Sequence, residues 1–345
     1  MRARRAAIVL AGVLLATALP AGSAGSAPEF GAIEVSARPI RQFDSGSQKT
    51  RFGKLTFVGG LELRSSNSRF GSLSAFRFTD SKGRFLAVSD TGLWIEGRLL
   101  RDEDGRPAEI REARIEPILD ADGQPATAKR AVDAESLAIF EGQAVVGFEG
   151  VTRIATYSPA ADPARGRAHL WPLPIPRKEL RANQGLEAIA TPPASSPLAG
   201  KLVTVSEHSL DASGNLLAAI FDSQTSALFS VRRDENWDVS DGAFLPEGDL
   251  LLLERRYTGI LHGIDMRIRR VAGQAIRPGA LVDGPVIMEA DLSQEIDNME
   301  GLEVSLDPDG TPRLTLVSDD NGNFFQRTLL LEFRLEETAG RQTRR

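Results

Sequence analysis

The sequence predicts an all-β protein: a single β-propeller of five or six four-stranded blades, with the ring closed by N- and C-terminal strands. A strand–turn–strand unit recurs five times, starting at residues 71, 133, 184, 241 and 300, so the copies are 51 to 62 residues apart. This period suits one propeller blade. No stretch shows a sustained helical period of apolar residues. A β-sandwich is the alternative all-β fold, but it does not predict this regular recurrence.

The clearest copy of the repeated unit lies near the C-terminus. A β-rich strand, Glu300–Leu306, is followed by the turn Asp307–Gly310 and by a second strand, Arg313–Asp319. In the turn, Pro308 presets the backbone φ and Gly310 accepts a positive φ. The segment therefore predicts an antiparallel hairpin.

The other four copies follow the same plan. They are Gly71–Phe78 with Phe85–Asp90, Asp133–Phe140 with Ala144–Glu149, Gln184–Ala190 with Lys201–Glu207, and Asp241–Leu245 with Leu250–Glu254. Strand-like runs such as Leu93–Leu100, Leu216–Phe221 and Thr328–Leu335 lie between the copies. The N-terminal runs near residues 33–35 and 55–63 either complete the last blade, which removes an exposed sheet edge, or add a sixth.

Composition narrows the class of protein. The 345 residues carry a formal net charge of −6, which argues against a general nucleic-acid binder because such a protein needs a basic face. Hydrophobic residues make up 41% of the chain, enough for a sizeable core. There is no cysteine, so disulfides, thiolate catalysis and cysteine-ligated metals are excluded.

The N-terminus is typical of a secretory signal peptide. Arg2, Arg4 and Arg5 precede the apolar run Ala6–Leu19, and small residues follow. We expect cleavage after Ala24 and export to the periplasm or the medium, by the general or the twin-arginine route. A retained membrane anchor is the alternative. The expected organisation is a signal peptide over 1–24, a propeller domain over 25–337 with no membrane span, and a flexible tail over 338–345.

Acidic side chains recur at matching places in the five hairpins. The second strands end on Asp90, Glu149, Glu207, Glu254 and Asp319, and the first strands contain Glu135, Glu187, Asp241, Glu300 and Glu303. In an antiparallel hairpin, the start of the first strand lies beside the end of the second. Since the first strands of a propeller line its channel, we expect these carboxylates to gather at one mouth of the channel.

Crowded carboxylates repel one another unless a proton or a cation intervenes. Calcium suits such a site because it takes six to eight oxygen ligands, and Asn183, Gln184, Asn298 and Asn321 offer amide oxygens nearby. The absence of cysteine and the presence of only three histidines argue against zinc or copper. The alternative is that the acids are solvated turn residues or pair with arginines.

We assign each candidate site residue a role. The predicted calcium ligands are Asp90, Glu149, Glu254, Glu303 and Asp319. The predicted catalytic residues are Glu135, Glu187, Glu207 and Glu300, and the predicted substrate-binding residues are Arg255 and Arg256. His208, next to Glu207, is either a general base or an exposed loop residue. The mature chain has no Gly-x-Ser-x-Gly, P-loop, dinucleotide or HExxH motif.

Several short motifs together resemble the bacterial phytase-like domain family, described as having esterase-like activity of phytase. They are Gly59–Leu61, Val88–Gly92, Asp133–Leu137, Gln184–Ala188, Leu251–Arg255, Asn298–Glu303, Val317–Asn321 and Gln326–Leu330. The resemblance runs from about Phe52 to Phe333 and implies a propeller, export and hydrolysis of phosphoric or carboxylic esters. By analogy with the calcium-dependent β-propeller phytases, it implies metal-assisted attack of water. The scarcity of lysine argues against inositol hexakisphosphate as the substrate.

The sequence therefore predicts an exported, monomeric hydrolase that acts on a small-molecule ester at an acidic channel mouth. Two other functions stay open. One is a lactonase of the gluconolactonase type, which also places a divalent ion in the channel. The other is a non-catalytic, calcium-stabilised propeller that binds a ligand or an envelope partner.

Overall fold

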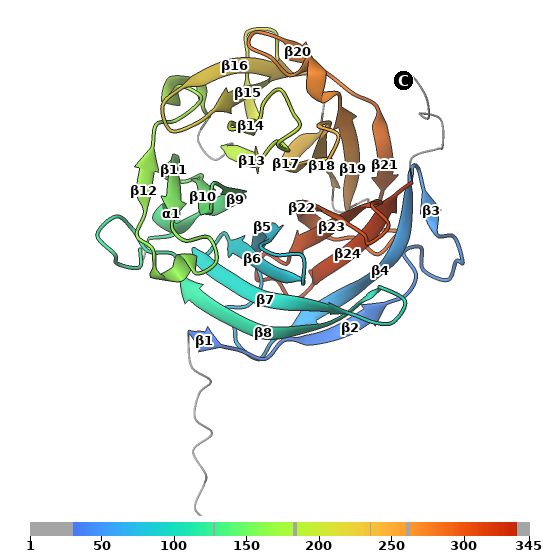
Figure 1. Cartoon of the computed structure of the whole chain (residues 1–345). Coiled ribbons are helices and arrows are strands. Elements are labelled where there is room, and N and C mark those ends of the chain that lie inside the picture. Colours follow the sequence, from blue (N-terminus) through green and yellow to red (C-terminus); the bar gives the residue numbers. More distant parts are fainter. Residues whose placement is uncertain (1–29, 127, 182–184, 235, 260–262, 337–345) are drawn as a thin grey trace, which may run out of the picture.

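The computed structural model describes residues 30–126, 128–181, 185–234, 236–259 and 263–336. Five antiparallel sheets stand around a central axis like the blades of a propeller (Figure 1). The predicted signal peptide and C-terminal tail lie outside the described residues, as do Asn183, Gln184 and His262. In the described part of the chain, no helix is long and apolar enough to cross a membrane.

Each blade is a sheet whose first strand faces the axis. From the axis outward, blade 1 contains β5 (Leu73–Phe78), β6 (Arg84–Ser89), β7 (Leu93–Arg101), β8 (Pro107–Pro117) and β1 (Gly31–Ala32). Blade 2 contains β9 (Ala134–Phe140), β10 (Gln143–Phe148), β11 (Arg153–Tyr157) and β12 (His169–Trp171). Blade 3 contains β13 (Leu186–Ala190), β14 (Leu202–Leu210), β15 (Leu216–Phe221), β16 (Ser226–Val231) and β20 (Leu281–Val282).

The last two blades use the C-terminal half of the chain and the N-terminal strands. Blade 4 contains β17 (Asp238–Phe244), β18 (Leu250–Gly259), β19 (Gly263–Val271) and β21 (Val286–Ala290). Blade 5 contains β22 (Asn298–Leu306), β23 (Pro312–Asp319), β24 (Thr328–Leu335), β4 (Leu55–Arg64) and β2 (Ser36–Ile40), with β3 (Arg51–Phe52) paired to β4. Within the described ranges, helical structure is limited to α1 (Lys129–Val132) and three short 3-10 turns, Pro163–Arg165, Arg177–Glu179 and Gly273–Ala275.

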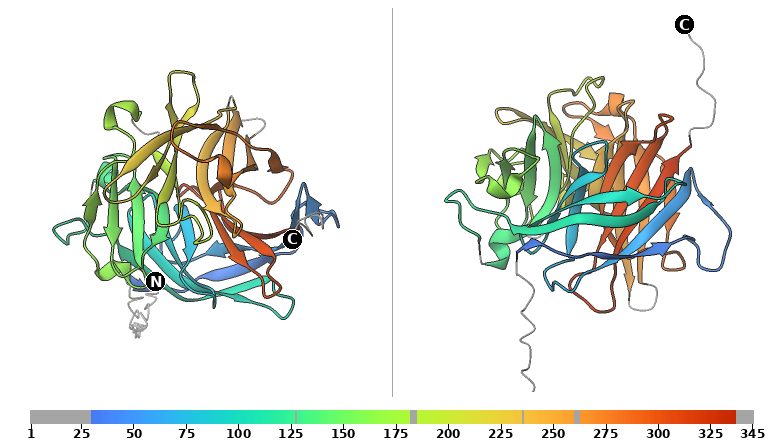
Figure 2. Two further views of the ribbon diagram at one scale, coloured as in Figure 1. Left: turned by 45° about the horizontal axis from the view of Figure 1, so that its top comes forward. Right: turned by 60° about the horizontal axis from the view of Figure 1, so that its bottom comes forward.

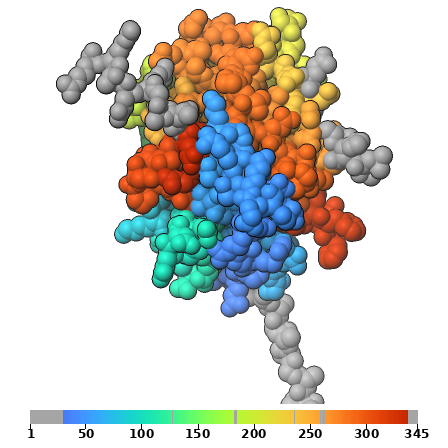
Figure 3. Space-filling view, turned by 90° about the vertical axis from the view of Figure 1, so that its right-hand side faces the viewer, coloured from blue at the N-terminus to red at the C-terminus, as the bar shows by residue number. Residues whose placement is uncertain are grey.

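The ring is closed within blade 5, as the sequence predicts. The N-terminal strand β4 pairs with the C-terminal strand β24 from Leu63↔Thr328 to Leu55↔Leu335. Figure 3 shows this N-terminal segment, in blue, packed between C-terminal residues in red and orange. Because the N-terminal strands complete blade 5, the propeller has five blades and the sixth is not formed.

The five predicted hairpins are the two innermost strands of the five blades: β5–β6, β9–β10, β13–β14, β17–β18 and β22–β23. Their order around the axis can be followed in Figure 1, and Figure 2 shows the same ring in two tilted views. The apolar side chains between neighbouring blades form five buried clusters, one at each blade-to-blade junction. Burial of a large apolar side chain contributes roughly 1.5–3 kcal/mol. These junctions therefore hold the inner strands, and the residues on them, in fixed positions around the channel.

Candidate metal and hydrolase site at the channel mouth

The same irregularity occurs at the start of every inner strand. In each inner hairpin the pairing register shifts by one residue, so that one residue of the first strand has no partner. The five residues in this position are Ser74, Glu135, Glu187, Ser240 and Glu300. A β-bulge of this kind re-aims a side chain and is common beside functional sites. The bulge thus forms a ring around the axis, and in three blades it carries a glutamate.

A second ring forms where the second strands end. In each second strand, one residue pairs with the first-strand residue that precedes the bulge. The next residue of the second strand is an acid in four blades and an arginine in blade 4. The members are Asp90, Glu149, Glu207, Arg255 and Asp319. Together with Asp133, which precedes β9, the two rings form what we call the acidic mouth.

Two groups of carboxylates converge in the acidic mouth. The oxygens of Asp133, Glu135 and Glu149 lie within 4.8 Å of one another, and so do those of Glu149, Glu187 and Glu207. Glu149 belongs to both groups, and its Oε1 also accepts a hydrogen bond from the Gly185 N–H at 3.2 Å. Carboxylates from blades 2 and 3 therefore meet at one end of the channel. Asp241, Glu254 and Glu303, which we expected there too, pair with arginines elsewhere.

Among the described residues, Lys129 and Arg255 form the ion pairs with these acids. Lys129 of α1 contacts Asp90 at 2.6 Å and Asp133 at 2.8 Å. Arg255 pairs with Glu300 and lies 3.2 Å from Glu207. Eight carboxyl groups thus share two positive charges: Asp90, Asp133, Glu135, Glu149, Glu187, Glu207, Glu300 and Asp319.

Burial and mutual repulsion shift the protonation of this cluster. Burial, reinforced by the neighbouring carboxylates, raises the pKa of Glu135 and of Glu187 well above the usual value. Burial also raises the pKa of Glu149 and Glu207, and it raises that of Asp319 to about 7, with the charges of Asp90 and Asp320 adding to it. The mouth therefore holds protons at neutral pH unless a cation replaces them.

The donor set fits a hard divalent cation. Every candidate ligand in the two groups is a carboxylate oxygen, which is the ligand type that calcium prefers. In addition, Asp90 Oδ1 is buried and has no hydrogen-bond partner. A buried acceptor without a partner is costly, and a bound cation would satisfy it.

Three predicted site residues lie outside the acidic mouth. Glu254 is buried in blade 4 and pairs with Arg267 and Arg269. Arg256 pairs with Asp265 and lies over the Trp237 ring. The reason is strand alternation: residues 254 and 256 share one face of β18, while the residue between them faces the mouth.

Glu303 is the third predicted residue outside the mouth. It lies three residues beyond Glu300 on β22 and therefore further along the channel. There it approaches Arg77, with 3.7 Å between Glu303 Oε2 and Arg77 Nε. His208, a possible general base, is a strand residue of β14 and contacts Asp238 through Nδ1 at 2.8 Å.

Sequence reasoning missed the residue that fills the middle of the channel. Arg77 of blade 1 is buried and forms a bidentate pair with Asp241 of blade 4, with both Nη–Oδ distances at 2.8 Å. It also donates to the carbonyls of Ile189 in blade 3 and Leu302 in blade 5. One guanidinium thus joins four blades. In the sequence, the only signal for Arg77 is its place in the first hairpin copy, Gly71–Phe78. The other four copies have no arginine at the matching position, so the repeat does not single it out.

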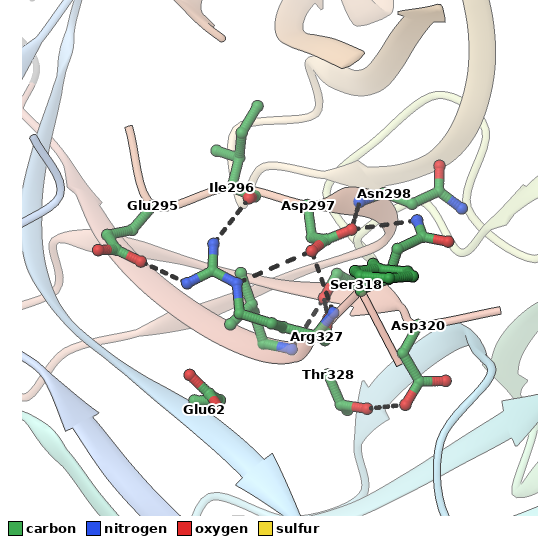
Figure 4. Close-up of polar contacts among 12 residues, drawn as sticks. Glu62, Glu295, Ile296, Asp297, Asn298, Ser318, Asp320, Arg327 and Thr328 are labelled. Carbon is green, nitrogen blue, oxygen red and sulfur yellow. Dashed lines mark hydrogen bonds and ion pairs between the residues drawn. The ribbon is translucent and has the colours of Figure 1, made fainter. Parts of the chain in front are cut away.

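The loop after Asp319 is held by hydrogen bonds. The Asp320 carboxylate accepts from the Ser72 N–H at 3.0 Å and from Thr328 Oγ1 at 2.7 Å. Figure 4 shows the next anchor, where the backbone N–H of Arg327 donates to Asp297 at 3.0 Å and its guanidinium donates to Glu295 at 2.6 Å. The loop is therefore fixed to the inner edge of blade 5.

This loop presents two aromatic side chains to solvent. Phe324 is 96% exposed and Phe325 is 87% exposed, and their ring centroids are 5.7 Å apart. Since the loop begins at Asp319, the aromatic pair stands on the same face of the propeller as the acidic mouth.

Comparison with known proteins shows which family the chain belongs to. A family model described as "Phytase-like: Esterase-like activity of phytase" matches residues 68–322, which span all five inner hairpins. The chain belongs to the phytase-like family. A search of curated proteins finds no match.

Two solved structures match the chain at low sequence identity. A PQQ-bound aldose sugar dehydrogenase from Streptomyces coelicolor is 12% identical, with a TM-score of 0.40, covering 89% of this chain and 100% of that one. A Saccharomyces cerevisiae complex of Dbp5 with Nup159, Gle1, IP6 and ADP contains a chain 11% identical, with a TM-score of 0.35, covering 86% and 99%.

Proposed function

We propose that the acidic mouth binds calcium and hydrolyses an ester of a small molecule. The observation that carries the proposal is the pair of three-carboxylate groups that share Glu149. The excess of carboxylates over cations, the raised pKa values and the orphaned oxygen of Asp90 support it, because each is relieved by a bound divalent ion. Membership of a family described by esterase-like activity supports the choice of ester substrates.

The chain's own residues have distinct tasks in this proposal. Asp133, Glu135 and Glu149 would hold one cation, and Glu149, Glu187 and Glu207 a second. When bound, calcium would supply positive charge that polarises the ester and acidifies a water molecule. Asp319 is the best-suited proton acceptor for that water, because its pKa of about 7 lies near neutral pH.

The cations of the mouth limit the charge of the substrate. Arg255 is engaged by Glu207, Asn298 and Glu300, and Lys129 by Asp90 and Asp133. Neither is free to neutralise several phosphate groups. The arrangement favours a monoester or a carboxylic ester over a polyphosphate, and we propose that the enzyme works after export, as its N-terminal sequence predicts.

The test is a comparison of metal-free and calcium-loaded protein. We expect hydrolysis of p-nitrophenyl phosphate or p-nitrophenyl acetate to disappear in EDTA and to return with excess calcium. Glu149→Gln should reduce kcat/KM at least about 100-fold and abolish the stronger calcium-binding event in calorimetry, because it removes the ligand common to both groups. Glu109→Gln, which changes a half-buried acid on β8 that pairs with Arg111, is the matched control and should behave like the unmodified protein.

Two results would contradict the proposal. One is hydrolysis that is indifferent to EDTA. The other is Glu149→Gln protein that keeps its calcium affinity and its rate. Turnover of lactones without turnover of either ester would instead support a lactonase, and calcium-dependent melting with no hydrolysis of any substrate would support a non-catalytic binding protein.

A further inference from the structure

The channel has a second cavity at the end opposite the acidic mouth. It has a volume of about 110 Å³, and Arg77, Thr191 and Glu303 are the polar side chains of its lining. It adjoins a wider groove of about 730 Å³, since Phe78, Phe244 and Val304 line both. We call the two together the lower cavity. No part of the proposed hydrolase site uses it.

The positive charge beside the lower cavity is fully engaged. Both terminal nitrogens of Arg77 donate to the Asp241 carboxylate, and they also donate to the carbonyls of Phe76, Leu302 and Ile189. Asp241 accepts the Leu302 N–H at 2.8 Å as well. Arg77 and Asp241 therefore neutralise each other and leave little capacity to bind an anion.

Glu303, in contrast, has no close charged partner. Its carboxylate accepts backbone hydrogen bonds from Val304 and, at a long 3.3 Å to Oε1, from Phe78, and its Oε2 is 3.7 Å from Arg77 Nε, beyond hydrogen-bonding distance. Its side chain is only 16% exposed. The charged groups that face it are Arg77 from β5 and Asp241 from β17, so the three together carry one net negative charge. A buried carboxylate in this state calls for a cationic or hydrogen-bond-donating partner.

Small residues make the space in front of Glu303. The residues three places after the bulge in blades 3 and 4 are Ala190 and Ala243, and both line the cavity. The corresponding residues in blades 1 and 5 are Arg77 and Glu303 themselves. Larger side chains at Ala190 and Ala243 would fill the cavity. The cavity therefore exists because these two channel positions hold alanine.

The outer part of the lower cavity has an apolar wall and a charged rim. Phe78, Phe244, Pro246 and Leu306 form the wall, and Asp80, Arg101, Asp307 and Arg313 lie at the rim. The arginines at its rim are paired, Arg313 with Asp307 at 2.6 Å and with Glu332 at 2.6 Å, and Arg101 with Glu332 at 2.5 Å.

We propose that the lower cavity binds a small organic cation, a primary ammonium carrying a short apolar tail. The ammonium would contact the Glu303 carboxylate at the inner end, and the tail would lie against Phe78 and Phe244. A pocket with apolar walls and a few placed polar groups is the usual form of a small-molecule site, and here the placed group is the Glu303 carboxylate. A metal ion is a poorer occupant, because among the described residues no group of three metal-ligating side chains gathers here.

The proposal is tested with n-hexylamine as the probe and 1-hexanol as its uncharged match. By isothermal titration at pH 8 in EDTA, we expect the amine to bind at least tenfold more tightly than the alcohol. Glu303→Gln should lose this preference. Glu135→Gln, which removes an acid from the mouth instead, should keep it. These two variants separate the lower cavity from non-specific attraction of amines to the acidic mouth.

A second measurement uses the unmodified protein. The pKa of Glu303 is raised to about 7, mainly by burial, while hexylamine stays protonated across neutral pH. Ionisation of Glu303 should strengthen amine binding on the order of tenfold between pH 6 and pH 8. Equal binding of amine and alcohol, or equal amine binding by Glu303→Gln and the unmodified protein, would overturn the proposal. So would an affinity that does not change with pH.

Discussion

The two halves of the channel carry charge in opposite ways, although the same five strands line both. In the acidic mouth, eight carboxyl groups share Lys129 and Arg255. In the middle of the channel, Arg77 and Asp241 form a matched pair with two hydrogen bonds of 2.8 Å. The scaffold alone therefore does not decide the function of a channel position. The matched pair joins four blades, whereas the unmatched cluster is the site at which we propose that a cation binds.

The matched pair should give the largest effect on stability. Arg77→Met leaves Asp241 buried with an uncompensated charge, which typically costs about 3–5 kcal/mol of unfolding free energy. Urea denaturation of the unmodified and variant proteins measures this. The double variant Arg77→Met/Asp241→Asn should recover a substantial part of the loss, because no unpaired charge remains. A loss below about 1 kcal/mol for Arg77→Met would show that the pair does not lock the channel.

The acidic mouth should make stability depend on pH in the opposite sense from an ordinary ion-paired acid. The folded pKa values of Glu135, Glu187 and Asp319 are raised, so between about pH 4.5 and pH 7 the folded protein binds more protons than the unfolded chain. The free energy of unfolding should therefore fall as pH rises through this window, on the order of 2 kcal/mol from pH 5 to pH 8 in EDTA.

Calcium at pH 8 should restore the stability that is lost on ionisation, since it offsets the same repulsion. Thermal denaturation at both pH values, with EDTA or with calcium, measures the effect. Asp319→Asn should flatten the profile in part, and the exposed Asp122→Asn should leave it unchanged. Protein that is more stable at pH 8 than at pH 5 in EDTA would contradict the charge imbalance on which the metal proposal rests.

Sequence alone predicted the repeat well because each hairpin is a local feature. Turn residues such as Pro308 and Gly310 fix the hairpins, and the recurrence fixes the ring. Closure by β4 and β24 followed from the need to remove an edge. The number of blades did not follow, because the N-terminal strands have the same pattern whether they start a blade or complete one.

Side-chain direction was harder to predict than position in the chain. The sequence predicts that Glu254 is the last residue of its strand and points into the mouth. The register of β17 and β18 instead places Arg255 at the position that Asp90, Glu149 and Glu207 hold in other blades. One residue of offset moves a side chain to the other face of a strand. The bulges that set this register depend on contacts between blades, such as the hydrogen bond from Ser240 to the Met299 carbonyl, and no local motif marks them.

The smallest effect should come from the rim of the mouth. Phe324 and Phe325 are almost fully exposed on a loop that hydrogen bonds hold in place, so they can pack against an aromatic part of a substrate. Aromatic pairs contribute about 0.5–1.5 kcal/mol. Phe324→Ala should therefore lower kcat/KM for a 1-naphthyl ester about 2- to 10-fold and leave the methyl ester of the same acid unaffected. Leu170→Ala, which removes an exposed apolar side chain from β12, is the matched control and should change neither substrate. An equal loss for both esters would contradict contact between Phe324 and the substrate. It would mean instead that Phe324 holds the loop, and through it the carboxylates of the acidic mouth, in position.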